Sequence, residues 1–202
     1  AVHRYEPAGE YDNVMQIMCR KMSQIFSQPI VSASHATIYG TAQSVYNFYM
    51  SSQDICLRIQ PRSLDTCKTL LGLLEFKKLA AESHWRSSLQ RIEELGILFL
   101  SHFGDSGSSS ELDSISAAVE HFKTLDDSIT CNLSEILLLT MTSIYQVFLE
   151  SKQFVSQDVG RQQEIVKLRR KSRNLMVLVG MLQYRVSQEV CAKMTRMDIF
   201  MN

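Results

Sequence analysis

Apolar residues recur at steps of three and four positions along most of this chain, which is the spacing that gathers them on one face of a helix. Between Tyr11 and Phe26 the apolar stripe consists of Val14, Ile17, Met18, Met22 and Ile25. Pro29 follows closely, and proline cannot continue a helix interior. The pattern therefore predicts an amphipathic helix over residues 11–26.

Further stretches with the same spacing predict helices along the rest of the chain, at residues of about 34–52, 63–82, 89–103, 110–125, 133–154 and 162–197. Ser63, Ser110 and Asn132 are placed to cap three of them. No run of alternating polar and apolar residues is long enough to predict a strand. We expect an all-α fold, a helical bundle of about six to eight helices, forming a single domain over residues 1–202.

One segment breaks the helical pattern by composition. Residues 104–110 read Gly-Asp-Ser-Gly-Ser-Ser-Ser, which predicts an internal linker. Its first four residues match the sequence around the nucleophilic serine of chymotrypsin-like proteases, but those enzymes are double β-barrels and this chain lacks the strands. The match is therefore assigned to the Ser/Gly composition of the linker.

The helix predicted over 133–154 is apolar on most faces, which favours a place at the centre of the fold. Its most apolar part, Ile136 to Leu149, is about 14 residues long and includes Thr140, Thr142, Ser143 and Gln146. A membrane-spanning helix needs about 20 predominantly apolar residues. We expect a core helix here and no contact with a membrane.

The last predicted helix, over 162–197, would be about 50 Å long if unbroken. Charge is segregated around it, since residues 104–159 hold nine acidic and two basic side chains, while residues 160–202 hold nine basic and three acidic ones. Opposite charges predict that the last helix lies against the acidic helices of the same chain. The alternative is antiparallel pairing between two chains.

Composition narrows the class of protein. The 202 residues are 45% hydrophobic and carry 21 basic and 21 acidic side chains, so the chain can bury a substantial core and lacks the bulk positive charge of a nucleic-acid binder. With only 3 Pro and 8 Gly, a collagen-like or turn-dense all-β chain is excluded. The five cysteines are widely spaced within helical patterns and predict free thiols.

Sequence signatures of catalysis and cofactor binding are missing. No Glu-x-x-His pair of a di-metal bundle, no Gly-x-Gly fingerprint and no phosphate-binding loop occurs, and no two cysteines have zinc-ligand spacing. We expect no catalytic, metal or cofactor site, and the chain is interpreted as a non-enzyme.

The sharpest charged feature is a run of five basic residues within seven positions of the last helix. Such a run could bind phosphates or act as a nuclear localisation signal, while a solvated helix face beside Leu168 and Leu175 explains it somewhat better. No aromatic residues are interleaved, so direct nucleic-acid contact is not expected. The predicted interaction surface combines these residues with the apolar stripe beside them: Lys167, Arg169, Arg170, Lys171, Arg173, Leu175, Val179, Leu182 and Val186.

The chain also contains 10 methionines, three of them in the first predicted helix and three near the end. Methionine adapts its shape, so these residues could fill a core or line a ligand pocket. The second use gives an alternative function, a small-molecule binding or sensing domain with an apolar pocket lined by Met and aromatic residues.

Residues 112–188 contain a helix reaching Cys131, then Leu137 to Phe148, and a late helix from Arg169-Arg170 through Leu182 to Ser187. This order of features resembles the C-terminal regulatory regions of fungal zinc binuclear cluster transcription factors of the aflatoxin-regulator type. The family's cysteine cluster is absent, so the resemblance does not imply DNA binding by this chain. It implies a regulatory, dimerising or ligand-sensing helical domain of a nuclear protein.

Taken together, these patterns predict a non-enzymatic helical regulatory or protein-interaction domain, with transcription regulation as the function that the resemblance implies. The expected partner is another protein or a second copy of the chain. The expected location is intracellular, with the nucleus as the compartment implied by the resemblance.

Overall fold

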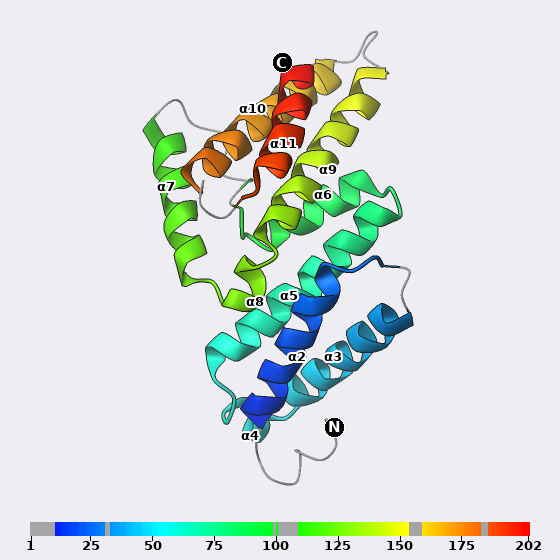
Figure 1. Cartoon of the computed structure of the whole chain (residues 1–202), viewed down its shortest axis with the longest axis vertical. Coiled ribbons are helices and arrows are strands. Elements are labelled where there is room, and N and C mark those ends of the chain that lie inside the picture. The colour runs from blue at the N-terminus through cyan, green and yellow to red at the C-terminus, as the bar shows by residue number, and fades with distance from the viewer. Residues whose placement is uncertain (1–10, 31–32, 99, 101–108, 154–158, 183–185) are drawn as a thin grey trace. The chain divides into compact units, whose positions relative to one another are not determined.

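The computed structural model describes residues 11–30, 33–98, 100, 109–153, 159–182 and 186–202 (Figure 1). All ten regular elements in these ranges are helices, which confirms the predicted all-α class, and two of the ten are single turns of four residues. The helices are α2 (Tyr11–Phe26), α3 (Ala33–Ser51), α4 (Gln53–Cys56), α5 (Pro61–Ala81), α6 (Trp85–Glu94), α7 (Ser109–Thr124), α8 (Asp127–Thr130), α9 (Leu133–Gln153), α10 (Val159–Met181) and α11 (Gln188–Met201).

The chain divides into two compact units. Unit 1 comprises Ala1–Lys78 and Asp126–Asn132, and unit 2 comprises Leu79–Leu125 and Leu133–Asn202. The single domain expected over 1–202 stays a prediction. Of the predicted linker, residues 104–108 lie outside the described residues, and residues 109–110 already belong to α7.

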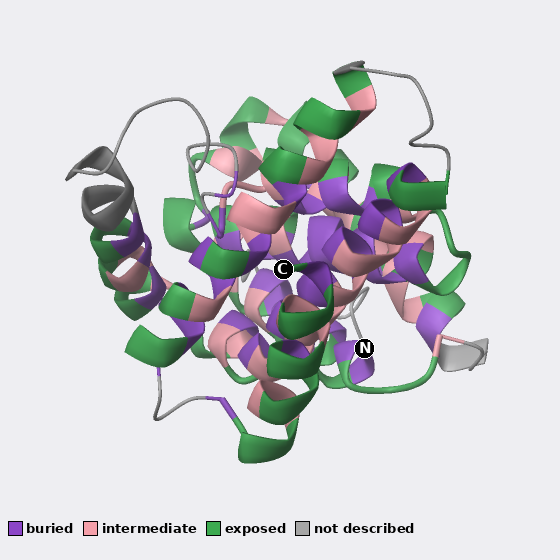
Figure 2. Cartoon of the chain, turned by 90° about the horizontal axis from the view of Figure 1, so that it is seen from above, coloured by how far each residue is buried: buried purple, intermediate pink, exposed green. Residues whose placement is uncertain are grey.

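In unit 1, α2 packs beside α3 and α8. Its buried face carries the predicted stripe, including Val14, Met18 and Met22, and the rings of Tyr11 and Tyr49 meet edge to face with centroids 5.5 Å apart. Figure 2 shows how buried and exposed positions alternate around individual helices. The periodicity of α2 thus correctly predicted four of its buried residues, whereas Ile17 of the predicted stripe is 37% exposed.

A buried lysine closes the C-terminal end of α2. Lys77 of α5 is only 8% exposed, and its ammonium donates to the carbonyl oxygens of Phe26 and, over 3.0 Å, of Gln28. The same nitrogen lies 5.1 Å from the centroid of the Phe26 ring. The last carbonyls of a helix have no partner within it, so Lys77 supplies both a donor and a positive charge where the helix dipole favours one.

A short return segment, residues 126–132, belongs to unit 1 although α6 and α7 of unit 2 precede it in the chain. Asp126 caps α8 by accepting from the Ser128 backbone N–H over 2.9 Å. Buried Asn132 donates to the Ser23 hydroxyl over 3.0 Å, and its Oδ1 accepts from Ser27 over 2.7 Å. These side-chain hydrogen bonds hold the segment on α2.

In unit 2, α9 lies at the centre and packs against α6, α10 and α11, as its apolar sequence predicted (Figure 1). Its polar residues are satisfied internally: Thr140 Oγ1 donates to the Ile136 carbonyl over 2.8 Å, and the Ser143 and Ser88 hydroxyls lie 3.0 Å apart. Among the described residues, α9 alone has the length and apolar composition of a membrane span, and half of its most apolar window is buried inside the protein.

The predicted continuous C-terminal helix is wrong, because the structure divides it into α10 and α11. α10 ends at Met181, and the Ser187 hydroxyl begins α11 by accepting from the Val190 N–H over 3.3 Å. The two helices then run antiparallel, with Ser172 bonded to Asp198 over 2.6 Å and Arg169 to the Met201 carbonyl over 2.6 Å. Folding back buries both apolar faces against α9, whereas one rod of about 50 Å would leave much of that surface in water.

The helix expected over 89–103 is also shorter than its apolar pattern, since α6 ends at Glu94. Gly96 follows with a φ of +65°, a left-handed conformation that glycine adopts without steric cost. Ile97 and Leu98 remain buried after the turn. Their apolar character therefore reflects burial of an irregular segment.

Candidate protein-interaction site

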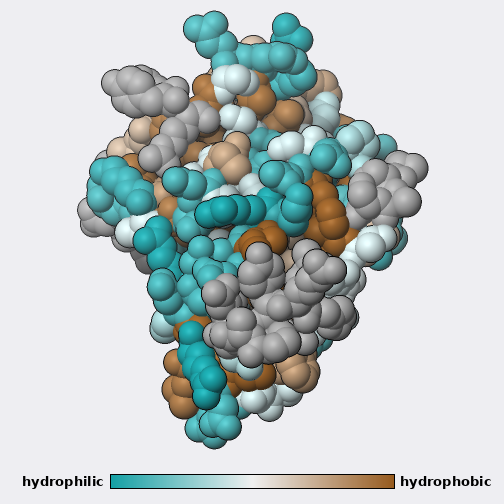
Figure 3. All heavy atoms as spheres, turned by 60° about the horizontal axis from the view of Figure 1, so that its bottom comes forward, coloured by the Kyte–Doolittle hydropathy of each residue, from teal (hydrophilic) through white to brown (hydrophobic). Residues whose placement is uncertain are grey.

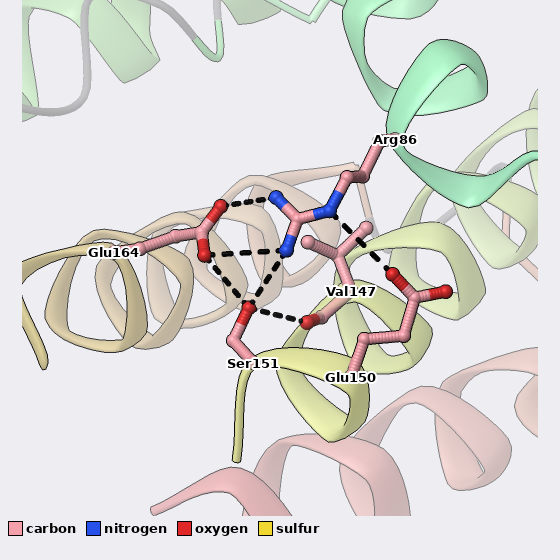
Figure 4. A network of polar contacts seen from close by, with 5 residues as sticks. All are labelled: Arg86, Val147, Glu150, Ser151 and Glu164. Atoms are coloured by element: carbon pink, nitrogen blue, oxygen red, sulfur yellow. Dashed lines mark hydrogen bonds and ion pairs between the residues drawn. The ribbon is translucent and has the colours of Figure 1, made fainter. Parts of the chain in front are cut away.

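One polar network joins α6, α9 and α10 at the Arg86 side chain (Figure 4). The Arg86 guanidinium forms ion pairs with Glu164 and with Glu150, whose Oε2 lies 3.5 Å from Arg86 Nε. Arg86 Nη2 also donates to Ser151 Oγ over 3.1 Å. The Ser151 hydroxyl in turn lies 2.7 Å from Glu164 Oε2 and 2.8 Å from the Val147 carbonyl oxygen. One arginine from α6 thus holds side chains of the two neighbouring helices.

The network keeps both of its main charges. The hydrogen bond to Glu164 raises the pKa of Arg86 above its ordinary value, and the same bond, reinforced by Ser151, lowers the pKa of Glu164. The Arg86 side chain is 54% exposed and that of Glu164 is 34% exposed, so water screens their attraction. We expect the pair to stabilise the fold by about 0.5–1 kcal/mol.

A groove of about 400 Å³ lies beside this network, between α6 and α10. Lys171 forms an ion pair across it with Glu93, and both side chains are about one-fifth exposed. Two pairs of opposite charges in the lining, Arg86 with Glu164 and Lys171 with Glu93, therefore neutralise each other. The described lining contains no histidine or cysteine, and the carboxylate bonded to Ser151 is held by Arg86, so the arrangement is suited to holding helices together.

The four apolar residues of the predicted interaction surface belong to the core of unit 2. Leu175 is 0% exposed, Val179 4%, Leu182 8% and Val186 9%. The stripe that they form is the buried face of α10 and of the residues that follow it, and a contact role for these four residues stays a prediction. Sequence spacing located this face but could not tell a core face from a contact face.

The structure divides the five predicted basic residues between two sides of α10. Lys167 and Lys171 line the groove beside α6. Arg169 contacts both α9 and α11: its guanidinium carbon lies 5.7 Å from the Phe148 ring centroid in α9, and its Nε donates to the Met201 carbonyl in α11. Arg173 donates to Asn202 Oδ1 over 3.2 Å. Arg169, Arg170 and Arg173 line a different cavity. A contact role for these five residues stays a prediction.

That second cavity lies along α10 and measures about 440 Å³. Val166, the three arginines and Asn174 line it. Asn174 is 6% exposed, and its Nδ2 has no hydrogen-bond partner among the described residues. Asn174 was not predicted from the sequence, although an asparagine directly beside Leu175 in a helical stripe indicates a buried polar group.

Apolar side chains continue this side of α10. Val166 is 62% exposed, Val177 40% and Met181 49%. With Arg170 and Arg173 they follow one another at steps of three and four, so Val166, Arg170, Arg173, Val177 and Met181 share one side of the helix, the outer face of α10. Elsewhere too, hydrophobic side chains reach the surface among hydrophilic ones, as Figure 3 illustrates for one view.

The cavities described in this structure do not match the alternative, an apolar pocket lined by Met and aromatic residues. The methionines Met15, Met22, Met141, Met194 and Met201 are all 0% exposed and fill the cores of the two units. The cavity described in unit 1, of about 630 Å³, has a polar lining that includes Arg20, Arg62 and Asp126. No group of three potential metal ligands occurs in the described part of the chain, where all five cysteines are free.

Comparison with known proteins identifies the family. A family model described as Nup93/Nic96 matches residues 1–193. The chain belongs to the Nup93/Nic96 family. It is 25% identical to the nucleoporin NIC96 of Saccharomyces cerevisiae over 205 aligned residues, which cover 96% of this chain and 23% of that protein. It is 28% identical to the nuclear pore complex protein Nup93 of Xenopus laevis, with coverage of 100% and 24%.

The fold agrees with this assignment. The crystal structure of Chaetomium thermophilum Nic96 SOL superposes with a TM-score of 0.82 and 19% sequence identity, over 96% of this chain and 30% of that one. At this identity the likeness concerns the fold. The chain spans about a quarter of the length of the curated Nup93 and NIC96 relatives that it matches.

Membership of the Nup93/Nic96 family corrects the functional predictions. The resemblance of residues 112–188 to fungal zinc cluster regulators is wrong, and with it the transcription-regulatory function and the dimer that it implied. The alternative, a small-molecule sensor, is wrong for the same reason. Helical apolar spacing reports packing, which unrelated all-α proteins share, so it could not identify ancestry. An intracellular location near the nucleus agrees with the nuclear pore proteins to which the chain is related.

Proposed function

We propose that this chain is a non-enzymatic helical segment of a nuclear pore scaffold protein, and that it acts by contacts with other proteins of the pore. The observation that carries this proposal is the family match over residues 1–193, together with curated relatives that are named as nucleoporins. The proposal keeps the expected protein partner and places it at the nuclear pore.

The arrangement of unit 2 supports a mechanical role. Its central helix α9 contacts three neighbours, and the Arg86 network and the pair of Lys171 with Glu93 tie α6 to α9 and α10. Interdigitated helices with paired charges between them resist sliding, because any shift breaks packing and ion pairs together. Such a unit holds its outward surfaces in fixed positions for partners.

Localisation of the intact protein tests the proposal. With a fluorescent tag at its native locus, the protein should give a punctate ring at the nuclear envelope and should co-purify with nucleoporins. Diffuse staining of the cytoplasm or nucleoplasm, without co-purifying nucleoporins, would contradict it.

A core variant separates the contribution of this segment from that of the rest of the protein. Ile144, which is 0% exposed in α9, is replaced by Asp to unfold unit 2. We expect Ile144→Asp to weaken the ring signal, whereas Lys193→Asp on the exposed side of α11 should leave it unchanged. Equal ring signals in the two variants would show that this segment is dispensable for assembly.

A further inference from the structure

Beside the outer face of α10, Asn174 has a hydrogen-bond donor that no described residue uses. Asn174 is only 6% exposed, it lines the cavity of about 440 Å³, and its Nδ2 has no partner among the described residues. A buried unpaired donor destabilises a protein, so such groups are rare in native structures and call for an explanation. An acceptor supplied from outside the chain would satisfy it.

Positive charge surrounds this donor. Arg169, Arg170 and Arg173 line the same cavity. Two of them are already oriented by α11, since Arg169 donates to the Met201 carbonyl over 2.6 Å and Arg173 to Asn202 Oδ1 over 3.2 Å. A guanidinium has five N–H donors, so each retains donors for a further acceptor after one such bond. The chemistry of the cavity therefore selects an anion, and its planar guanidinium groups match a carboxylate in two-point contact.

Exposed apolar side chains also recur at helical spacing on the outer face of α10. Val166, Val177 and Met181 are 40% to 62% exposed and stand on either side of Arg170 and Arg173 along the helix. From residue 166 to residue 181 the helix rises by about 22 Å. A partner that covers this face needs apolar groups at helical spacing with acidic groups between them.

This combination favours a peptide over other anionic partners. The described lining of the cavity contains no aromatic residue on which a nucleic-acid base could stack. A lipid headgroup would use the arginines but would leave the regular spacing of the three apolar side chains without a function. An amphipathic helix laid along a groove uses both, through anchors three and four residues apart.

We propose that the outer face of α10 is a docking site for an acidic amphipathic segment of a partner protein, with a carboxylate bound by Asn174 and the neighbouring arginines and apolar side chains placed on Val166, Val177 and Met181. This inference rests on the proposed function as a scaffold segment, for which it specifies the chemistry of one partner.

Binding of a designed probe to the purified 202-residue chain tests the proposal. The probe is a fluorescent 16-residue peptide with Leu at steps of three and four and Glu between them, and a matched peptide has Gln in place of every Glu. Fluorescence anisotropy should show binding of the Glu peptide that weakens as salt is raised, and binding of the Gln peptide that is about tenfold weaker.

Two variants locate the site. The double variant Arg170→Glu with Arg173→Glu should weaken binding of the Glu peptide by about tenfold or more. Arg196→Glu, with Arg196 on the exposed side of α11, is the control for charge reversal and should stay within about twofold of the unmodified chain. Far-UV circular dichroism checks that all variants are folded.

The substitution Asn174→Leu distinguishes a role of Asn174 in peptide binding from a role in stability. Leucine removes the unpaired donor at similar volume, so the melting temperature should stay level or rise, while the Glu peptide binds about threefold more weakly. A residue with only a structural role would change stability and binding in the same direction.

Three results would overturn the proposal: no binding of the Glu peptide up to its solubility limit, equal binding by the chain and the double arginine variant, or binding of phosphatidylserine vesicles in place of the peptide. The third result would assign the face to an anionic lipid surface. Because the nuclear-envelope ring tests the scaffold function separately, a protein that keeps its ring signal but ignores the peptide would contradict only the docking site.

Discussion

Two buried polar side chains, Lys77 in unit 1 and Asn174 in unit 2, occupy similar positions and have opposite surroundings. Lys77 is 8% exposed and Asn174 6%, and they belong to helices of 21 and 23 residues. Lys77 donates to the carbonyls of Phe26 and Gln28, whereas Asn174 Nδ2 has no partner among the described residues. Burial alone therefore does not define the role of a polar residue, because only the first of these two completes its hydrogen bonds within the fold.

The largest effect is expected for Lys77→Met, which keeps the aliphatic stem and removes the donor. The Phe26 carbonyl would remain buried without its charged partner and the Gln28 carbonyl would lose its donor, so unfolding should become easier by about 2 kcal/mol. Urea denaturation measures the change, and hydrogen exchange of the α2 amides locates it in unit 1. Lys78→Met, at the exposed neighbouring position, should change the unfolding free energy by less than about 0.5 kcal/mol. Equal effects of the two substitutions would contradict the capping role.

Asn174→Leu should shift stability in the other direction. Removing an unpaired buried donor relieves its desolvation, so we expect a gain of up to about 1 kcal/mol in the free energy of unfolding. The same urea titration, followed by the fluorescence of Trp85 in unit 2, gives the value. A loss of about 1 kcal/mol or more would show that Asn174 is satisfied within the folded chain, and the contrast with Lys77 would disappear.

The change of stability with pH tests the surroundings of Lys77, because His35 is buried near this residue. His35 is 5% exposed with an unpaired Nε2, and burial, assisted by the positive charge of Lys77, lowers the pKa of the imidazole. The unfolded chain therefore binds a proton more readily, so stability should fall as pH drops through the ordinary histidine pKa of about 6.5 toward the lower folded value. Thermal unfolding between pH 7.5 and 5 measures this slope. His35→Phe should flatten it, while His84→Phe, at an exposed position, should not.

The smallest effect is expected for the ion pair of Arg86 and Glu164, because both of its side chains are partly exposed to water. A double-mutant cycle with Arg86→Met and Glu164→Gln should give a coupling of about 0.5 kcal/mol that decreases with salt. Because hydrogen bonds from Arg86 and Ser151 lower the pKa of Glu164, its contribution is present above the ordinary glutamate pKa of about 4.3 and is lost as pH falls below it. A coupling above about 2 kcal/mol would show that the network is shielded from water.

Sequence periodicity predicted the helices because each one buries a single face. Most of the α2 stripe was predicted correctly, since Val14, Met18, Met22 and Ile25 are buried, and α9 was correctly expected at the centre of its unit. The same spacing failed to predict that α10 ends at Met181 and that α11 begins at Gln188, because apolar residues continue the pattern. Apolar spacing reflects which residues are buried. Two helices that pack antiparallel on the same core can therefore show one nearly continuous apolar pattern.

The candidate site was only partly accessible to sequence reasoning. The basic run was visible, but its division between the groove and the outer face of α10 depends on how α10 packs against α6 and α11. The partners of Arg86 lie on α9 and α10, more than 60 residues away, and no local sequence pattern predicts them. Family membership needed comparison with other chains, because apolar spacing is shared by unrelated helical proteins.

The return segment, residues 126–132, has a consequence for how the chain is made and cut. Unit 1 lacks the Asn132 side chain that bonds to Ser23 and Ser27 until residue 132 has been synthesised, and by then α6 and α7 of unit 2 have already been synthesised. The two units therefore cannot mature one after the other during translation, as consecutive domains do. For the same reason, no single cut separates the two units, and a fragment that ends at residue 78 would expose the surface of α2 that this segment covers.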